Sequence, residues 1–434
     1  MRVSRHNWKG EDPAALAGEL RALAPPLSDL TAEVSGLIEE VRSDGDAAVL
    51  RLEERFGGSP PEELRVPEKA IRDALGAAEE ARPALETAAA NLRAVAAAEV
   101  AADREAEAEL PAGQRVRLRS VPVGAAGAYV PGGAAVYPST ALMTCVPACE
   151  AGVERVAVAS PPGREGLPDP LVLAACALGG ASEVYAMGGV QAIAALALGT
   201  ESVAAVDVVV GPGNRYVQEA KRQLFGTVGM EGIAGPSELM AVIDGSADPR
   251  WIALDLASQA EHGGDGLLVA VAAAPHHLQA LEAEIELLAH RPDSTIADAP
   301  LALVIAPDLQ ASVELANAVA PEHLQLACEG AEVLAEEVHT AGCVFTGPYG
   351  ATVFGDFVAG SNHVLPTGGA GRFAGPLGPR SFRRRIATVR IPQEAARELA
   401  PSAATLARAE GFPLHAESAE VRGRSAGEAE ERPD

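Results

Sequence analysis

The sequence predicts an α/β protein that carries two parallel-sheet domains in tandem. Apolar segments of strand length alternate with helical segments from about residue 153 to residue 346, and this alternation is typical of parallel sheets covered by helices. Two of the strand-to-helix junctions carry glycine-rich turns, where backbone N–H groups can meet a phosphate or a ribose. At 434 residues, 48% of them hydrophobic, the chain is long enough for two or three domains with large cores.

The chain up to about residue 120 is predicted to be mostly helical. Thr31 can cap a helix whose apolar residues recur every three or four positions as far as Val41. The alanine- and glutamate-rich stretch 83–110 predicts a longer helix, and its run of charges is most simply a solvated face.

Two α/β runs follow, and each is expected to form a sheet of its own. The first has expected strands at 153–159, 182–187 and 203–210, and helices at 169–178, at 191–198 and from the turn at 211–214 to residue 223. The second has helices at 249–261, 275–290 and 309–319, and strands at 266–272, 301–306, 324–327 and 343–346. The glycine-, proline- and arginine-rich segment 368–385 is expected to be irregular, and the polar last dozen residues to be disordered.

Net charge, apolar runs and cysteine content argue against nucleic-acid-binding, secreted and membrane-spanning classes of protein. A net charge of −26 argues against nucleic acid or an anionic membrane as a partner, since both require a basic face. The charged start of the chain predicts no signal peptide, and no apolar run reaches the roughly 18 residues of a membrane-spanning helix. Five cysteines without a C-x-x-C pair predict reduced thiols and a cytoplasmic location, with Cys145 and Cys149 as small, buried apolar side chains.

Lysine is nearly absent, and Lys9, Lys69 and Lys221 are the only three. A Schiff-base or pyridoxal mechanism requires a lysine at its centre. Only Lys221 lies near glycine-rich sequence, and it is predicted to occupy the exposed face of a helix. The sequence therefore disfavours these enzyme classes.

Four of the nine histidines lie in short polar clusters: His262 after Gln259, His323 after Glu322, His363 after Asp356, and His415 after Glu410. Together the clusters supply imidazoles, carboxylates and a side-chain amide. These are ligands of a hard or borderline metal, and they include a ready acid/base pair. Such a concentration indicates a functional site.

Four residues of these clusters form a candidate metal site. Gln259 and His262 are three residues apart near a predicted helix end, which places both on one face. Alone they would more often be an ordinary polar helix end, Asp356 a turn residue, and His415 a helix-end cation. Jointly the four offer two imidazole nitrogens and two oxygens, which suit zinc.

Glu322 and His323 follow Pro321, between a predicted helix and a predicted strand. Two adjacent side chains on a loop can reach one substrate, whereas on a strand they would point to opposite faces. The alternative is a surface turn with two polar residues.

The glycine-rich segments are Tyr129-Val-Pro-Gly-Gly133, Gly188-Gly-Val-Gln191 and Gly211-Pro-Gly-Asn214. None matches the G-x-G-x-x-G fingerprint of dinucleotide-binding sheets. Sharp turns required by packing explain several of these glycines equally well.

Six motif groups, in order along the chain, resemble those of the histidinol dehydrogenase family. They are Tyr129-Val-Pro-Gly-Gly with Tyr137-Pro-Ser-Thr140, Gly211-Pro-Gly-Asn214, Ala234-Gly-Pro-Ser-Glu238, Ser258-Gln-Ala-Glu-His262, Pro321-Glu-His323 and Asn362-His-Val-Leu-Pro-Thr367. The resemblance runs from about residue 33 to His415. It is interrupted at 228–233, where the family usually carries Asp-Met or a similar pair.

The resemblance implies an enzyme that uses NAD as a cosubstrate and one zinc ion per subunit. Its reaction would oxidise L-histidinol, through the aldehyde, to L-histidine, the last step of histidine biosynthesis. The implied fold has two Rossmann-like parallel-sheet domains in tandem with small N- and C-terminal helical segments, in an intertwined homodimer. The implied parts are an arm 1–23, a zinc and catalytic domain 24–128 with 240–378, an NAD-side domain 129–239, and a dimerisation segment 379–434 with a disordered tail.

Each candidate residue takes its implied role from the family motif that it matches. The zinc positions match Gln259, His262, Asp356 and His415, and the acid/base pair matches Glu322 and His323. The substrate-contacting positions match Ser237, His363 and Glu410, together with the zinc positions and His323. The positions near NAD match Tyr129, Gln191 and Asn214. Because the family's C-terminal segment completes the partner's site, His415 and Glu410 are expected to act in trans.

In this scheme His323 takes protons in both oxidations and Glu322 activates water for the aldehyde. Two other functions stay open. The nearer is a related zinc- and NAD-dependent dehydrogenase for another small polar alcohol, and the substrate set Ser237, His363 and Glu410 argues against it. The other is a catalytically silent metal- or nucleotide-binding protein, which would have no need of a base beside its ligands.

Overall fold

The structure is a computed structural model that describes residues 1–424, apart from gaps at 25–28, 58–59, 134, 164, 262, 264, 292–293 and 297–298. The chain forms two compact units. The first contains Met1–Val100 and Val123–Phe382, and the second contains Ala101–Pro122 and the chain from Arg383 onward. Both parallel sheets lie in the first unit, so the α/β class predicted from the sequence is confirmed.

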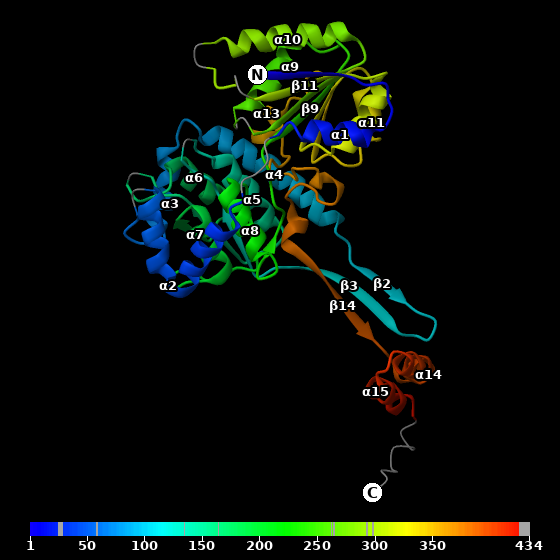
Figure 1. Ribbon diagram of the computed structural model, residues 1–434. Helices are drawn as coiled ribbons and strands as arrows, with labels where there is room; N and C mark the ends of the chain where they lie inside the picture. The colour runs from blue at the N-terminus through cyan, green and yellow to red at the C-terminus, as the bar shows by residue number, and fades with distance from the viewer. Residues whose placement is uncertain are drawn as a thin grey trace. The chain divides into compact units, whose positions relative to one another are not determined.

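A six-stranded parallel sheet has the strand order β1-β11-β10-β9-β12-β13. Its strands are β1 (Arg2–Asn7), β9 (Glu238–Ile243), β10 (Leu267–Ala272), β11 (Pro300–Ile305), β12 (His323–Ala327) and β13 (Cys343–Thr346). Helices α1 (Pro13–Arg21) and α11 (Leu309–Val319) pack on one face, while α9 (Pro249–Ala260) and α10 (Pro275–Ala289) pack on the other (Figure 1). The shorter helices α12 (Ala331–Ala335) and α13 (Thr352–Phe357) flank β13 in the chain.

A five-stranded parallel sheet has the order β6-β5-β4-β7-β8. Its strands are β4 (Ala125–Tyr129), β5 (Arg155–Ser160), β6 (Glu183–Ala186), β7 (Val208–Val210) and β8 (Gly229–Met230). One face is covered by α3 (Glu68–Ala77), α4 (Arg82–Ala102), α5 (Pro138–Glu150) and α6 (Pro170–Gly179). The other is covered by α2 (Thr31–Gly57), α7 (Gly189–Leu198) and α8 (Arg215–Leu224).

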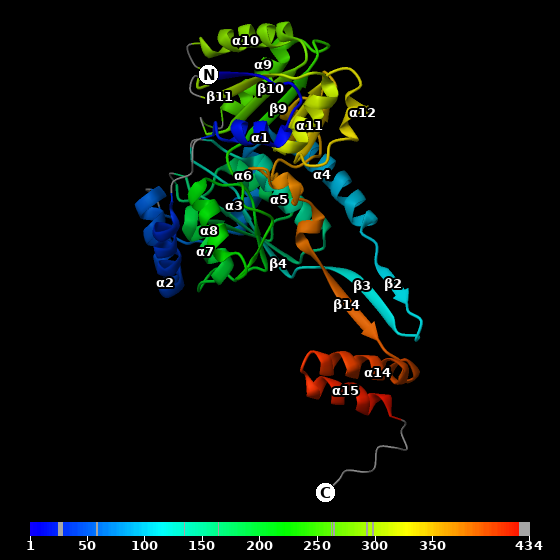
Figure 2. The same cartoon turned by 45° about the vertical axis from the view of Figure 1, so that its right-hand side comes forward.

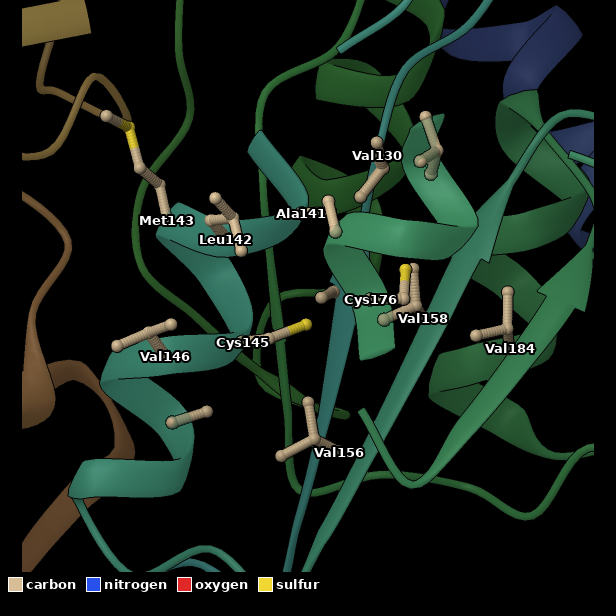
Figure 3. Close-up of a cluster of buried hydrophobic side chains, with 14 of the residues drawn as sticks. Val130, Ala141, Leu142, Met143, Cys145, Val146, Val156, Val158, Cys176 and Val184 are labelled. Atoms are coloured by element: carbon tan, nitrogen blue, oxygen red, sulfur yellow. The ribbon is translucent and has the colours of Figure 1, made fainter. Parts of the chain in front are cut away.

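The core between this sheet and α5 is drawn in Figure 3. Cys145 of α5 points toward Val156 and Val158 of β5 and Cys176 of α6, and Leu142, Met143 and Val146 of α5 and Val184 of β6 belong to the same core. Removing this apolar surface from water is the main source of stability. Cys145 is fully buried, as expected, and burial raises its thiol pKa. All five cysteines carry free thiols.

The second unit contains an antiparallel sheet of order β14-β3-β2. Its strands are β2 (Ala106–Glu109), β3 (Arg115–Pro122) and β14 (Arg383–Arg390), and β14 leads into the helices α14 (Gln393–Ala409) and α15 (Pro413–Gly423) (Figure 2). The two helices pack against each other. Asp103, near the start of the unit, forms ion pairs with Arg383 and Arg385 of β14 and so joins the two chain segments of the unit.

Several sequence predictions differ from the structure. The stretch before residue 120 is not all helix, because β1, β2 and most of β3 lie there, and the helix expected over 83–110 ends at Ala102. The segment 368–385 contains the 3₁₀ turns η1 (Ala370–Arg372) and η2 (Pro379–Phe382) and the start of β14. Strands β4 and β9 and helix α5 had no counterpart among the expected elements.

The expected grouping of 24–128 with 240–378 also differs from the packing. Apolar residues of α2, among them Val34 and Leu52, enter the same core as α7 and α8 of the five-stranded sheet. The arm 1–23 instead supplies β1 and α1 to the six-stranded sheet. Of the residues described, none belongs to a helix both long and apolar enough to span a membrane.

Candidate active site

The candidate catalytic residues gather at the amino-terminal ends of two neighbouring strands. Glu238 begins β9, His323 begins β12, and the register of the two parallel strands places His323 beside Leu239. Glu322 directly precedes β12. His323 is therefore a strand residue and not a loop residue as expected, but it lies where the strand begins, so both side chains still approach the same region.

The turn into β12 is fixed locally. Helix α11 starts at Asp308, whose carboxylate accepts a hydrogen bond from the Ala311 N–H at 2.7 Å. It ends at Ala320, which takes the left-handed conformation at φ 50°, and Pro321 prevents the helix from continuing. The chain thus turns sharply at the end of the helix, and this turn places Glu322 and His323 at the amino-terminal end of β12.

The protonation state of His323 follows from its partner. Its Nδ1 atom lies 3.0 Å from the backbone carbonyl oxygen of Glu238. A carbonyl oxygen only accepts, so Nδ1 carries a proton, and in the neutral form of the imidazole Nε2 presents a lone pair. The Nε2 atom is buried without a hydrogen-bond partner and lies 3.4 Å from Oδ1 of Asp356. It can therefore accept a proton from a bound molecule.

Glu322 is buried and held by the backbone of Glu238. Its Oε2 atom accepts a hydrogen bond from the Glu238 N–H at 2.8 Å and lies 3.5 Å from Nδ1 of His323. Burial raises the pKa of Glu322 to about 7, although the nearby imidazole opposes the rise. Burial lowers the pKa of His323, but the carboxylates of Glu322 and Asp356 outweigh it and raise that pKa to about 9. At neutral pH the imidazole of the ligand-free protein is therefore mostly protonated, and it can act as a base once Nε2 has lost its proton.

Two of the four expected metal ligands lie together. Nε2 of Gln259, in the last turn of α9, lies 3.4 Å from Oδ2 of Asp356 on α13, and Oε1 of Gln259 is buried without a partner. His262 lies outside the described residues, and His415 belongs to the second unit. Within the described ranges, no three His, Cys, Asp or Glu side chains gather as metal ligands do.

The loop after α13 brings the expected substrate residue His363 next to this pair. Its Nδ1 atom lies 3.0 Å from the backbone oxygen of Asp356, and its Nε2 atom lies 2.9 Å from the hydroxyl of Thr140 on α5. Asn362 donates to the backbone oxygen of Met143, also on α5, at 2.7 Å. The loop therefore joins the candidate metal and acid/base residues near the six-stranded sheet to a helix of the five-stranded sheet.

Three further residues were expected to contact substrate. Ser237 is partly buried and directly precedes Glu238, so it lies at the same sheet edge. Glu410 ends α14 and His415 lies on α15, both exposed within the second unit. The ring of His415 lies 5.3 Å from that of Phe412.

The three residues expected near NAD lie at the carboxyl-terminal edge of the five-stranded sheet: Tyr129 ends β4, Gln191 follows β6, and Asn214 follows β7. The hydroxyl of Tyr129 accepts from the Gly189 N–H at 3.1 Å, and Nε2 of Gln191 donates to Glu53 at 2.7 Å. The side chain of Asn214 caps α8. A cavity of about 500 Å³ opens at the same edge, lined in part by Gly132, Gly133, Ser160 and Pro161.

Sequence reasoning missed Glu53, a buried carboxylate of α2. Its Oε1 atom accepts from the Gly188 N–H at 2.6 Å and from Gln191, so it fixes the turn between β6 and α7. Burial raises the pKa of Glu53, against these two hydrogen bonds. Nothing in the local sequence distinguishes it from the exposed glutamates of the same helix.

The prediction for Lys221 was wrong. Its side chain is fully buried, and Nζ lies 2.7 Å from Oε1 of Glu231 and 3.1 Å from the backbone oxygen of Gly211. The same oxygen of Glu231 accepts from the Gly211 N–H at 2.7 Å. Helix α8 turns this one cationic position inward, so the ion pair braces the glycine-rich turn that ends in Asn214.

Comparison with known proteins identifies the family of the chain. The family model described as histidinol dehydrogenase matches residues 24–423. The histidinol dehydrogenase of Thermus thermophilus is 45% identical over 395 residues, covering 90% of this chain and 93% of the relative. That of Methylococcus capsulatus is 42% identical over 411 residues, covering 91% of this chain and 92% of the relative.

A solved structure agrees over nearly the full length. The crystal structure of histidinol dehydrogenase from Elizabethkingia anophelis matches with a TM-score of 0.89 at 29% identity, covering 97% of this chain and 98% of that one. Because the family match spans nearly the whole chain and the relatives cover it to the same extent, this chain belongs to the histidinol dehydrogenase family of oxidoreductases.

Proposed function

We propose that the chain oxidises L-histidinol, through L-histidinaldehyde, to L-histidine with NAD and zinc, in the last step of histidine biosynthesis. Membership of the family supports the reaction class. The observation that carries the proposal is the buried His323, whose Nδ1–H is taken by a backbone carbonyl near the buried carboxyl of Glu322 and whose Nε2, once unprotonated, is left as a base.

His323 takes the role of proton acceptor. Oxidation of an alcohol requires loss of the hydroxyl proton as the hydride leaves, and oxidation of the hydrated aldehyde requires the same. The Nε2 atom is oriented for both steps because Nδ1 is anchored to Glu238. NAD, when bound, accepts the hydride in each step.

Glu322 takes the role of water activator. Burial keeps its carboxyl poised to exchange a proton near neutral pH, and its Oε2 atom lies within 3.5 Å of the imidazole. Hydration of the aldehyde needs a base for water, and a carboxylate in this position can serve as that base.

The donor set suits zinc. Gln259, His262, Asp356 and His415 are the residues that we assign to the ion, and the unpartnered buried Oε1 of Gln259 beside Asp356 supports this assignment. A bound zinc ion would fix the imidazole and amino group of histidinol next to His323. Ser237, His363 and Glu410 are assigned to the substrate on their motif matches.

Tyr129, Gln191 and Asn214 are assigned to the NAD side, supported by their common place at the carboxyl-terminal edge of the five-stranded sheet. We further propose an intertwined homodimer in which Glu410 and His415 complete the partner's site. A cytoplasmic location stays a prediction from composition.

The decisive experiment measures NADH formation with L-histidinol against other small amino alcohols. We expect two NADH per histidinol and little turnover of the alternatives. Turnover of a different polar alcohol in preference to histidinol would favour the related dehydrogenase, and no turnover of any alcohol by zinc-loaded protein would favour a catalytically silent binding protein.

A further inference from the structure

Glu238 holds both members of the acid/base pair. Its backbone N–H donates to Glu322, its carbonyl oxygen accepts from His323, and its carboxylate accepts the Glu322 N–H at 3.2 Å. The same carboxylate accepts the Gly368 N–H at 2.9 Å. Any displacement of Glu238 therefore moves the base and the carboxyl together.

The carboxylate of Glu238 is neutralised from the N-terminal arm. Nη1 of Arg21, the last residue of α1, lies 3.0 Å from Oε1 of Glu238, and the two side chains are 23% and 7% exposed. A carboxylate this deeply buried is stable as an anion only with a partner. Arg21 supplies that partner from a segment remote in the chain.

Arg21 also fixes the turn that leads into the acid/base pair. Its Nε donates to the backbone oxygen of Val319 at 3.0 Å, and its Nη2 donates to that of Ala320 at 3.1 Å. These carbonyls end α11, where a cation is favourable. Ala320 is held at positive φ, a conformation that alanine adopts only when its surroundings impose it.

We propose that Arg21 is a positioning residue for the Glu322–His323 pair. It acts through Glu238 on one side and through the end of α11 on the other, so one guanidinium sets both the residue that holds the pair and the turn that leads into it. The family match begins at residue 24, so this contribution lies outside it. The proposal rests on the catalytic roles proposed above.

The test compares Arg21→Met, which keeps the aliphatic stem, with Arg5→Met as control. Arg5 belongs to the same arm and forms an exposed ion pair with Glu282. We expect kcat for NADH formation from histidinol to fall by about 10- to 100-fold in Arg21→Met, because small misplacement of reacting groups has such effects, with the KM values for histidinol and NAD changing far less. Arg5→Met should match the wild type.

Two further variants separate positioning from stability. Arg21→Lys keeps the charge but not the forked geometry and should recover part of kcat. Arg21→Met/Glu238→Gln removes the unpaired buried charge as well and should exceed Arg21→Met in kcat. If Arg21→Met fails to fold, Arg21→Lys tests the positioning role instead. A lowered kcat at an unchanged unfolding temperature would then support that role.

A folded Arg21→Met protein with wild-type kcat would overturn the inference, as would an Arg21→Lys protein with wild-type kcat where Arg21→Met does not fold. Failure of the proposed function looks different. In that case wild-type protein would not oxidise histidinol, or Glu322→Gln would retain full activity, whatever Arg21 does.

Discussion

Glu238 and Glu322 are joined by a reciprocal pair of hydrogen bonds, in which the backbone N–H of each residue donates to the carboxylate of the other, at 2.8 and 3.2 Å. The pair bridges the first residue of β9 and the residue before β12. The carboxyl of Glu322 is thereby fixed by backbone groups and not by mobile side chains. The carboxyl of Glu322 therefore has little rotational freedom, which suits a group that has to meet a water molecule in one place.

Glu322→Gln is expected to impair the two half-reactions unequally. Water activation is needed only after the aldehyde has formed, so oxidation of supplied histidinaldehyde should slow by about 10²- to 10⁴-fold, and oxidation of the alcohol less. His323→Asn should impair both. Single-turnover measurements of each half-reaction check this. Equal loss in both for Glu322→Gln protein that still binds zinc and NAD would contradict the division of roles.

Removal of metal should abolish turnover, and zinc or a similar divalent ion should restore it. The reason is the oxygen pair at Gln259 and Asp356, one of whose oxygens is buried without a partner. Elemental analysis should find one zinc per subunit in the wild type and less in Asp356→Ala. Full activity in rigorously metal-free protein would rule out the metal's role.

The dimer proposal predicts complementation between two inactive variants. His415→Ala and His262→Ala subunits, dissociated and reassociated together, should form heterodimers in which one site carries both defects and the other carries neither. Activity should return to part of the wild-type value, measured as NADH formation. If labelled subunits exchange and no activity returns, the site is built within one chain.

Lys221→Met should destabilise the protein by about 3–5 kcal/mol, because it leaves Glu231 partly buried without its cation. It should also raise KM for NAD, since the Gly211–Asn214 turn loses its brace. Arg222→Met is the control on the same helix, because its guanidinium is half exposed and its pair with Glu219 is expected to contribute only about 0–1 kcal/mol. Denaturant unfolding compares the two, and equal losses would argue against a special role for Lys221.

The buried carboxyl of Glu53 should make the free energy of unfolding depend on pH. Its folded-state pKa is raised by burial, so the folded protein holds this proton more tightly than the unfolded chain does. That contribution is complete below the ordinary value of 4.5 and is lost as pH rises through the raised pKa. The unfolding temperature of Glu53→Gln relative to wild type should therefore increase as pH rises from 4.5 to neutrality. A difference that stays constant over this range would show that the carboxyl titrates alike in both states.

Long periodic segments were predictable because their pattern is local. Helix α11 and strand β13 occupy the expected residues, since an apolar period or run is bounded there by clear start and stop signals. Strand β1 was missed because its sequence, RVSRHN, is polar and its pairing partner β11 lies far along the chain. This segment becomes a strand only because the folded chain brings it alongside β11.

The residues of the candidate site also fall into those that could be predicted from local sequence and those that could not. Glu322, His323, Gln259 and Asp356 could be found from residue type and motif, and the structure brings these four together. The supporting residues Glu53, Lys221 and Arg21 could not be found, because each acts on a partner from another element. A charged side chain buried by tertiary contact has the same local sequence signature as one in solvent.

The sheet edge formed by β1 has a practical consequence for protein production. A version trimmed to start at residue 24 would retain every position matched by the family model, yet it would replace the polar edge strand β1 by the apolar β11 as the open edge of the sheet. Open edges recruit strands from other molecules, so such a truncation invites aggregation. Affinity tags are therefore better fused at the far terminus, and purified protein with a clipped start should be discarded before any kinetic comparison.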